Sequence, residues 1–307
     1  MKRREFIQKS VGAGLMTGAA LSFGSMGRLF ANTSSVPDLP YDMVAIRGGE
    51  AETMFDKAIA SLGGMSKFVK KNQTVVVKPN IGWDASPERA ADTNPKLVAR
   101  IVEHCLRAGA KEVYVFDNTC NEWTRCYKNS GIENAVKTAG GKMVPGNTQN
   151  YYQQVELKNG KSLKSTKVHE LILSSNVFIN VPVLKNHGGA TMTIAMKNLM
   201  GVIWDRKYYH DNDLQQCIAD FAAYRKPDLN IVDAYRVMKR NGPRGVSVSD
   251  VATMKYQLIS PDIVAIDTAA TKLFGINPQQ VRHIALAEAE GAGTSNLESL
   301  RINRLTI

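Results

Sequence analysis

Short runs of apolar, often β-branched residues alternate along the chain with longer segments in which apolar residues recur at helical spacing. The runs that predict buried strands are 74–77, 113–117, 176–184, 229–232 and 256–259. The segments that predict helices are 54–68, 94–109, 132–139, 190–203 and 214–224. Because strands alternate with one-sided helices, the pattern predicts an α/β fold with a mostly parallel sheet flanked by helices on both faces.

One segment departs from this alternation. Asn159-Gly160 is a strong signal for a tight hairpin turn, and short strand-like runs flank it. We therefore expect a β-hairpin excursion from the main sheet at 151–166. No linker or low-complexity stretch divides the chain further, so residues 32–307 are expected to form a single α/β domain.

The first 31 residues have the order of an export signal: a basic start, a Gly- and Ala-rich apolar stretch and small residues up to Ala31. The adjacent Arg3-Arg4 resembles the twin-arginine (Tat) type of signal. We expect residues 1–31 to be removed after passage through the Tat translocase, which leaves a periplasmic protein. The apolar stretch is shorter than the roughly 20 residues that cross a bilayer, so no stable membrane span is expected.

Charge narrows the classes of ligand. The chain has 39 Lys and Arg against 28 Asp and Glu, a formal charge of +11. Five of the basic residues and one acidic residue precede position 32, so the rest of the chain carries +7. This excess suits a small anionic ligand. With 7% aromatic residues and no arginine-rich run, the chain is not expected to bind nucleic acid.

Polar side chains follow each predicted strand, and the carboxyl ends of parallel strands are where α/β proteins bind ligands. The residues at these positions are Lys78, Asn80, Asp117, Asn118, Lys185, Asn186, His187 and Asp233. From this set we expect Lys78, Asn80, Asp117 and Asp233 to bind a substrate or cofactor. Asp117 is as compatible with a helix-capping role.

The densest group of such residues lies at 185–201. Gly188-Gly189 predicts a tight turn before the helix expected at 190–203, whose first N–H groups could face an anion. On such a helix Thr193 and Lys197 would lie four residues apart on one face.

Three residues of this segment are the predicted catalytic residues. Lys185 and Lys197 could clamp a phosphate or carboxylate, and His187 could act as a general acid or base. Asn198 is expected to contribute to binding. The alternative is that Lys197 is a surface lysine and His187 a solvated loop residue.

Two further features are weaker. The glycine-rich loop around Arg244 could direct that side chain to an anion, or be a surface turn. A divalent metal is a candidate cofactor, with His187, His210 and Asp233 as candidate ligands, although their spacing matches no known zinc motif. The chain has neither a P-loop nor a Gly-x-Ser-x-Gly elbow, which disfavours nucleotide hydrolysis and serine hydrolase chemistry.

The four cysteines are too few for a disulfide framework. Cys120 and Cys126 could be free thiols or could form a disulfide in an oxidising compartment. No cysteine spacing fits a ferredoxin cluster, so an intrinsic iron–sulfur cluster is not expected.

Four motifs together resemble the DUF362 family, a set of α/β proteins whose activity is not established. They are Val75 to Asn80, Lys185 to Gly201, Ile231 to Gly245, and Asp262 to Asp267. The resemblance covers roughly 44–293. Some members of the family carry a ferredoxin-type segment, so the resemblance implies that a redox partner protein is a candidate even though this chain lacks the Cys run.

Two hypotheses of function follow. The first is an exported protein that binds an anionic small molecule or cofactor in a cleft lined by Lys and His, with acid–base catalysis if it is an enzyme. The alternative is a non-catalytic carrier or maturation factor that delivers a metal or cofactor to a periplasmic redox (iron–sulfur) partner. A weaker analogy is with racemases that place Lys and His around a nickel pincer.

Overall fold

The computed structural model describes residues 38–307, which form one compact unit. The expected export signal lies outside these residues. Among the described residues, no helix is both long and apolar enough to cross a membrane.

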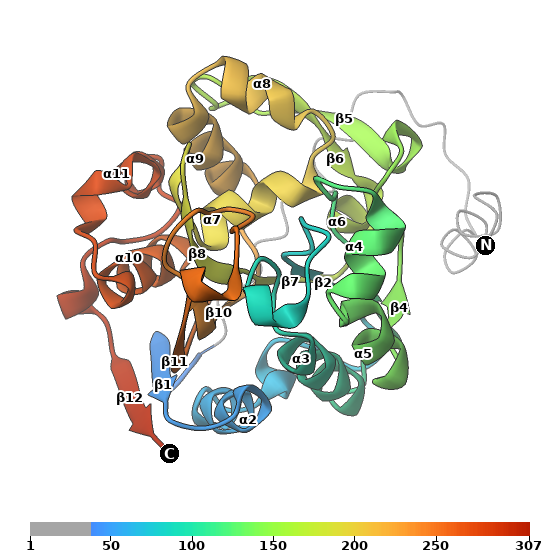
Figure 1. The fold of residues 1–307 in the computed structure, drawn as a ribbon, viewed down its shortest axis with the longest axis vertical. Helices are drawn as coiled ribbons and strands as arrows, with labels where there is room; N and C mark the ends of the chain where they lie inside the picture. Colours follow the sequence, from blue (N-terminus) through green and yellow to red (C-terminus); the bar gives the residue numbers. More distant parts are fainter. Residues whose placement is uncertain (1–37) are drawn as a thin grey trace, which may run out of the picture. The chain divides into compact units, whose positions relative to one another are not determined.

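A ten-stranded sheet forms the centre of the fold (Figure 1), with the strand order β12-β1-β11-β10-β7-β2-β3-β4. The bounds along this path are β12 Ile302–Thr306, β1 Met43–Arg47, β11 Val251–Ser260, β10 Leu229–Met238, β7 Val177–Val181, β2 Thr74–Pro79, β3 Glu112–Val115 and β4 Lys142–Met143. Two more strands lie off this path: β8 Val183–His187 pairs with β10, and β9 Thr191–Thr193 pairs with β8. Neighbours from β10 to β4 along the path run parallel, and β11 is antiparallel to both of its neighbours. The mostly parallel α/β fold expected from the sequence is confirmed.

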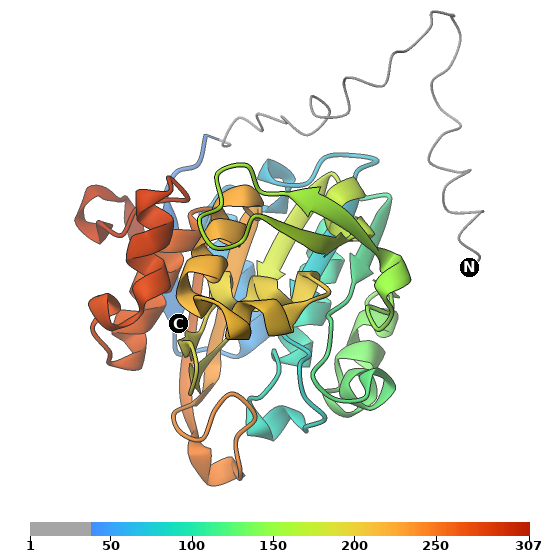
Figure 2. The same ribbon diagram turned by 90° about the horizontal axis from the view of Figure 1, so that it is seen from above.

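Helices cover both faces of the sheet (Figures 1 and 2). The helices are α2 Ala51–Ser61, α3 Pro95–Arg107, α4 Trp123–Asn129, α5 Ile132–Thr138, α6 Glu170–Ser174, α7 Ala195–Asn198, α8 Arg206–Asp211, α9 Leu214–Tyr224, α10 Ile263–Phe274 and α11 Arg282–Ala289. Short 3₁₀ turns are η2 Met65–Lys67, η3 Pro87–Arg89, η4 Gln149–Tyr151, η5 Leu199–Val202, η6 Val248–Asp250, η7 Pro278–Gln280 and η8 Leu297–Ser299.

The two faces of β2 show how the sequence separates the core from the site. Val75 and Val77 point into the main hydrophobic core with α2 and α3. Because successive side chains of a strand alternate between faces, Lys78 points to the opposite side, where it reaches Asn198 of α7. Lys78 thus takes a buried position on this other face of the strand that an apolar residue would otherwise occupy.

Helix α3 begins as its sequence predicts. The Asn94 side chain accepts a hydrogen bond from the Lys96 N–H, and Pro95 occupies the first turn, where its missing N–H costs nothing. The apolar stripe from Leu97 to Cys105 is buried against the sheet.

The hairpin excursion is confirmed as a separate two-stranded antiparallel sheet. It consists of β5 (Tyr152–Glu156) and β6 (Ser165–His169), with Asn159-Gly160 in the connection between them. The pairing extends three residues beyond the expected end of the segment, to His169.

The helix expected over 190–203 is wrong. Gly188-Gly189 instead forms the turn of a β8–β9 hairpin, and only the four residues of α7 are α-helical before the 3₁₀ turn η5. Nearly every residue from 190 to 203 is buried, so the segment has no polar face to indicate a period. Such a run is compatible with a helix or a strand, and pairing with β8 makes its first part a strand.

The strand expected to end at Asp233 is also longer than predicted. β10 continues through an irregularity between Ala234 and Arg236 as far as Met238, because β11 pairs with it along this whole length. Asp233 therefore lies in the middle of a strand and not at its end.

Candidate functional site

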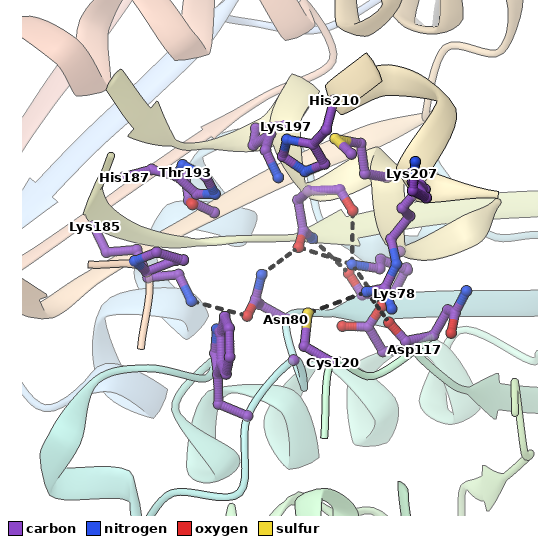
Figure 3. A pocket seen from close by; sticks show the side chains of 18 residues that line it. Lys78, Asn80, Asp117, Cys120, Lys185, His187, Thr193, Lys197, Lys207 and His210 are labelled. Carbon is purple, nitrogen blue, oxygen red and sulfur yellow. Dashed lines mark hydrogen bonds and ion pairs between the residues drawn. The ribbon is translucent and has the colours of Figure 1, made fainter. Parts of the chain in front are cut away.

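A pocket of about 380 Å³ lies beyond the carboxyl ends of β2 and β3 (Figure 3). Its basic lining residues are Lys78, Lys185, Lys197, Arg206 and Lys207. Of the described residues, Asp117 alone contributes a carboxylate to the lining. We call this cavity the lysine pocket; its volume is in the range of small-molecule sites.

The sheet brings together most of the residues that the sequence singled out. The predicted site residues that line the lysine pocket are Lys78, Asn80, Asp117, Lys185, His187, Lys197, Asn198 and His210. They lie on β2 or directly after it, in the segment after β3, and on β8, α7 and α8. The hairpin register places Lys185 opposite Thr193, so the antiparallel pair presents both side chains on the face toward the pocket.

A buried ion pair forms the floor of the pocket. Lys78 Nζ lies 3.1 Å from Asp117 Oδ1, and the two residues are 1% and 2% exposed. Lys78 Nζ also donates to the backbone and side-chain oxygens of Asn198, at 2.7 and 2.8 Å. Asp117 Oδ2 accepts the Ile81 N–H at 2.7 Å. One carboxylate oxygen thus accepts a backbone N–H, and the other lies against the Lys78 ammonium without a hydrogen bond among residues 38–307.

Burial and pairing act against each other on the pKa values of this pair. Burial lowers the pKa of Lys78 and raises that of Asp117, because each charged form loses its hydration. The charge of each partner opposes these shifts. The charged form of the pair therefore depends on the short distance between the two groups and on the hydrogen bonds that each makes with its neighbours.

Gly201 makes room for the pair. A Cβ atom at this position would lie 1.9 Å from Asp117 Oδ1 and 2.5 Å from Lys78 Nζ. Only glycine allows the backbone of η5 to approach the floor this closely. The requirement here is space and not a left-handed backbone.

An amide network links the floor to the second lysine. Asn80 Nδ2 donates to Asn198 Oδ1 at 2.9 Å, and Lys185 Nζ donates to Asn80 Oδ1 at 3.2 Å. Lys185 also donates to the Ala91 carbonyl oxygen. The opposing charge with the largest effect on its pKa is Asp92, which does not line the pocket; burial lowers the pKa of Lys185 and raises that of Asp92.

Lys197 has no such partner. Among residues 38–307 it makes neither a hydrogen bond nor an ion pair, although its side chain is half-buried and lines the pocket. Burial lowers its pKa to about 8, and the nearby charges of Lys185 and Arg206 act in the same direction. A partly desolvated cation surrounded by other cations indicates a place for an anion.

His187 is held in one tautomer. Its Nδ1 accepts hydrogen bonds from the backbone N–H groups of Gly189 and Ala190, each at 3.1 Å. Nε2 therefore carries the proton of the neutral ring, and burial lowers the ring pKa to about 3. His187 lines the pocket as a neutral hydrogen-bond donor.

The candidate metal ligands His187, His210 and Asp233 do not form a site for a divalent metal. A histidine ligand to a metal normally donates its second ring N–H to an acceptor, whereas the Nδ1 of His187 accepts two N–H groups. Residues 38–307 contain no group of three or more His, Cys, Asp or Glu side chains that could hold a metal ion. Of the other two candidates, His210 lines the pocket and Asp233 does not.

Two predicted binding residues lie elsewhere. Asp233 is buried in β10, and its carboxylate accepts the N–H groups of Asn94 and Tyr235 at 2.8 and 3.1 Å. It thereby anchors the start of α3. Arg244 lines a different pocket, beside Arg89.

Arg206 and Lys207 are pocket residues that the sequence did not identify. Both lie on helix α8, whereas the sequence prediction considered residues that follow strands. Arg206 donates to the carbonyl oxygens of Asn118 and Thr119 at 2.8 and 2.7 Å, which fixes its guanidinium at the pocket edge. It also lies 3.2 Å from the sulfur of Cys120.

All four cysteines are free thiols in the structure. Cys120 is exposed at the pocket, whereas Cys126 is buried. The structure thus has the thiol form of the two alternatives that the sequence left open.

The chain belongs to the DUF362 family, because the model of this domain of unknown function matches residues 75–272. A curated relative is a thylakoid-associated protein of Synechocystis sp., 26% identical over 245 residues; the match covers 77% of this chain and 74% of the relative.

Two solved structures share part of the fold. The lactate racemase apoprotein of Thermoanaerobacterium thermosaccharolyticum has a TM-score of 0.45 and 11% identity; the match covers 69% of this chain and 53% of that one. A protein from Thermotoga maritima has a TM-score of 0.46 and 10% identity, with coverage of 78% and 59%. The chain thus spans between half and three fifths of these two structures.

Proposed function

We propose that this chain binds a small anionic molecule, a carboxylate or a phosphate, in the lysine pocket. The observation that carries the proposal is the charge of the lining. Among residues 38–307, five Lys or Arg side chains line the cavity against one carboxylate; Lys78 is paired with that carboxylate and Lys207 with Asp211, which leaves Lys185, Lys197 and Arg206 without an ion pair. Cations without internal partners recruit anions of matching size, and charge-assisted hydrogen bonds then orient them.

Each group has a distinct role in this proposal. Lys197, which has no partner among residues 38–307, supplies the main charge, and Lys185 adds a second charge held in place by Asn80. His187 donates from Nε2 without adding charge, and the Thr193 hydroxyl lies beside it in Figure 3. The Lys78–Asp117 pair shapes the floor and does not take part in binding directly.

Titration calorimetry of the full-length chain tests the proposal. Sulfate, inorganic phosphate and malonate should each bind saturably, and added sodium chloride should weaken all three because the contacts are ionic. Choline chloride serves as the cationic control and should give no binding heat. Absence of saturable binding for all three anions would remove the basis of the proposal.

Sulfate binding is expected to weaken as the pH rises above about 8. A lysine must be protonated to hold an anion, and burial lowers the pKa of Lys197 to about 8, well below the roughly 10.4 of a free lysine. The bound anion favours the protonated form, so binding takes up a proton in this range. Affinity should then fall by up to about tenfold per pH unit.

Calorimetry with sulfate, whose charge is constant over this range, measures this profile. The Lys197→Gln variant should show a flatter profile. An affinity that stays constant in the wild-type chain until about pH 10 would show that Lys197 does not hold the anion.

We further propose that the chain is exported to the periplasm by the twin-arginine route, on the basis of Arg3-Arg4 in the first 31 residues. Replacing both arginines with lysine should retain the full-length chain in the cytoplasm, as measured by cell fractionation. Arg28→Lys is the matched control and should leave export intact. Equal export of the double variant would contradict this route.

A further inference from the structure

A second pocket with two unpaired arginines lies next to the lysine pocket. Its volume is about 420 Å³, and its lining includes Arg89, at the end of η3, and Arg244, in the loop between β10 and β11. Neither guanidinium makes an ion pair or hydrogen bond with another residue in the range 38–307. We call this the arginine pocket.

Burial makes the unpaired state of Arg89 costly. Its Nε is buried and has no hydrogen-bond partner in the described part of the chain. A buried donor without a partner loses its hydrogen bonds to water and gains no other hydrogen bond. Such an atom therefore indicates a position where a ligand could supply the acceptor.

The one carboxylate of the arginine pocket does not supply that acceptor. Asp84 is ion-paired with Arg125 at 2.6 Å and also accepts the Asn129 side-chain N–H at 2.6 Å. The lining therefore keeps a positive excess after internal pairing.

The loop that carries Arg244 is held in place next to Arg89. Asp250 accepts the Val246 N–H at 2.7 Å and the Asn241 side-chain N–H at 2.7 Å, which closes the loop on itself. A Cβ at Gly245 would lie 3.7 Å from Arg89 Nη2, so the Arg89 guanidinium lies against this backbone. The Arg89 guanidinium thus lies against the backbone of the loop that carries Arg244, whose exposed side chain lines the same pocket. An anion stabilises two like charges that share a pocket.

The same two loops line both pockets. Trp83 and Pro243 line the lysine pocket, and their chain neighbours Asp84 and Arg244 line the arginine pocket. One elongated molecule could therefore follow these loops from one pocket to the other.

We propose that Arg89 and Arg244 form a second anion subsite, which holds the distal carboxylate or phosphate of an elongated ligand whose first anionic group lies in the lysine pocket. This inference rests on the proposed function and adds a ligand class to it: molecules with an anionic group at each end. Each guanidinium offers a planar pair of donors that suits either group.

Calorimetry with alkane bisphosphonates of increasing spacer length, compared with methylphosphonate, tests the second subsite. One spacer length should bind the full-length chain at least about tenfold more tightly than methylphosphonate, because the second contact is intramolecular. Arg89→Gln and Arg244→Gln should each reduce this gain, and the double variant should remove it. Methylphosphonate affinity should stay unchanged, which also shows that the variants are folded.

Arg107→Gln, on an exposed residue of α3, is the control for the loss of one charge and should keep the gain. A gain that survives in the double variant, or no gain at any spacer length, would overturn the second subsite while leaving the lysine pocket intact. Methylphosphonate affinity that is unaffected by Lys197→Gln would instead overturn the proposed function.

Discussion

Replacing Gly201 with alanine is expected to destabilise the full-length chain by about 3 kcal/mol or more and to abolish sulfate binding. The new methyl group would lie 1.9 Å from Asp117 Oδ1 and 2.5 Å from Lys78 Nζ, so the buried ion pair must separate or the backbone must move. Breaking a buried pair costs about 3–5 kcal/mol, because an uncompensated charge stays inside. Urea unfolding measures the loss of stability, and calorimetry measures the loss of binding.

Gly188→Ala is the matched control within the same segment. A Cβ at Gly188 would meet no atom of the described part of the chain within 4 Å. The free energy of unfolding of this variant should therefore lie within about 0.5 kcal/mol of the wild-type value. If Gly201→Ala proved equally stable, the ion pair would not be the fixed floor of the pocket.

Replacing Lys197 with glutamine is expected to weaken sulfate binding by about 10- to 100-fold without lowering the melting temperature. A hydrogen bond from a charged donor contributes about 1.5–3 kcal/mol, and each 1.4 kcal/mol corresponds to a factor of ten. In the free protein the Lys197 charge is partly desolvated and repelled by Lys185 and Arg206. Removing this charge should therefore not lower the free energy of unfolding. Calorimetry and thermal unfolding measure the two effects separately.

Lys128→Gln removes the same charge from an exposed position on α4 and should leave both quantities unchanged. A drop in melting temperature for Lys197→Gln, with affinity preserved, would show that this lysine is structural.

Strand ends explain why much of the site was predictable from the sequence. Lys78, Asp117 and Lys185 directly follow or close apolar runs, and parallel pairing brings the ends of such runs to one edge of the sheet. The alternation of strands and helices likewise specified the fold class. These inferences need only local sequence and one rule of topology.

The remaining site residues depend on contacts between distant segments. Asp233 was misplaced because pairing with β11 extends β10 beyond the predicted end. Nearly every residue of the 190–203 segment is buried, so only its pairing with β8 shows that Thr193 belongs to a strand. Arg206 enters the pocket from α8 through hydrogen bonds to the 118–119 backbone, which no spacing in the sequence reveals.

A crystal structure of the full-length chain grown with selenate tests the central claim most directly, because the anomalous signal of selenium locates the anion. We expect a selenate in the lysine pocket, within hydrogen-bond distance of Lys197 Nζ and His187 Nε2. A lysine pocket without selenate, in a crystal that binds selenate elsewhere on the chain, would contradict it.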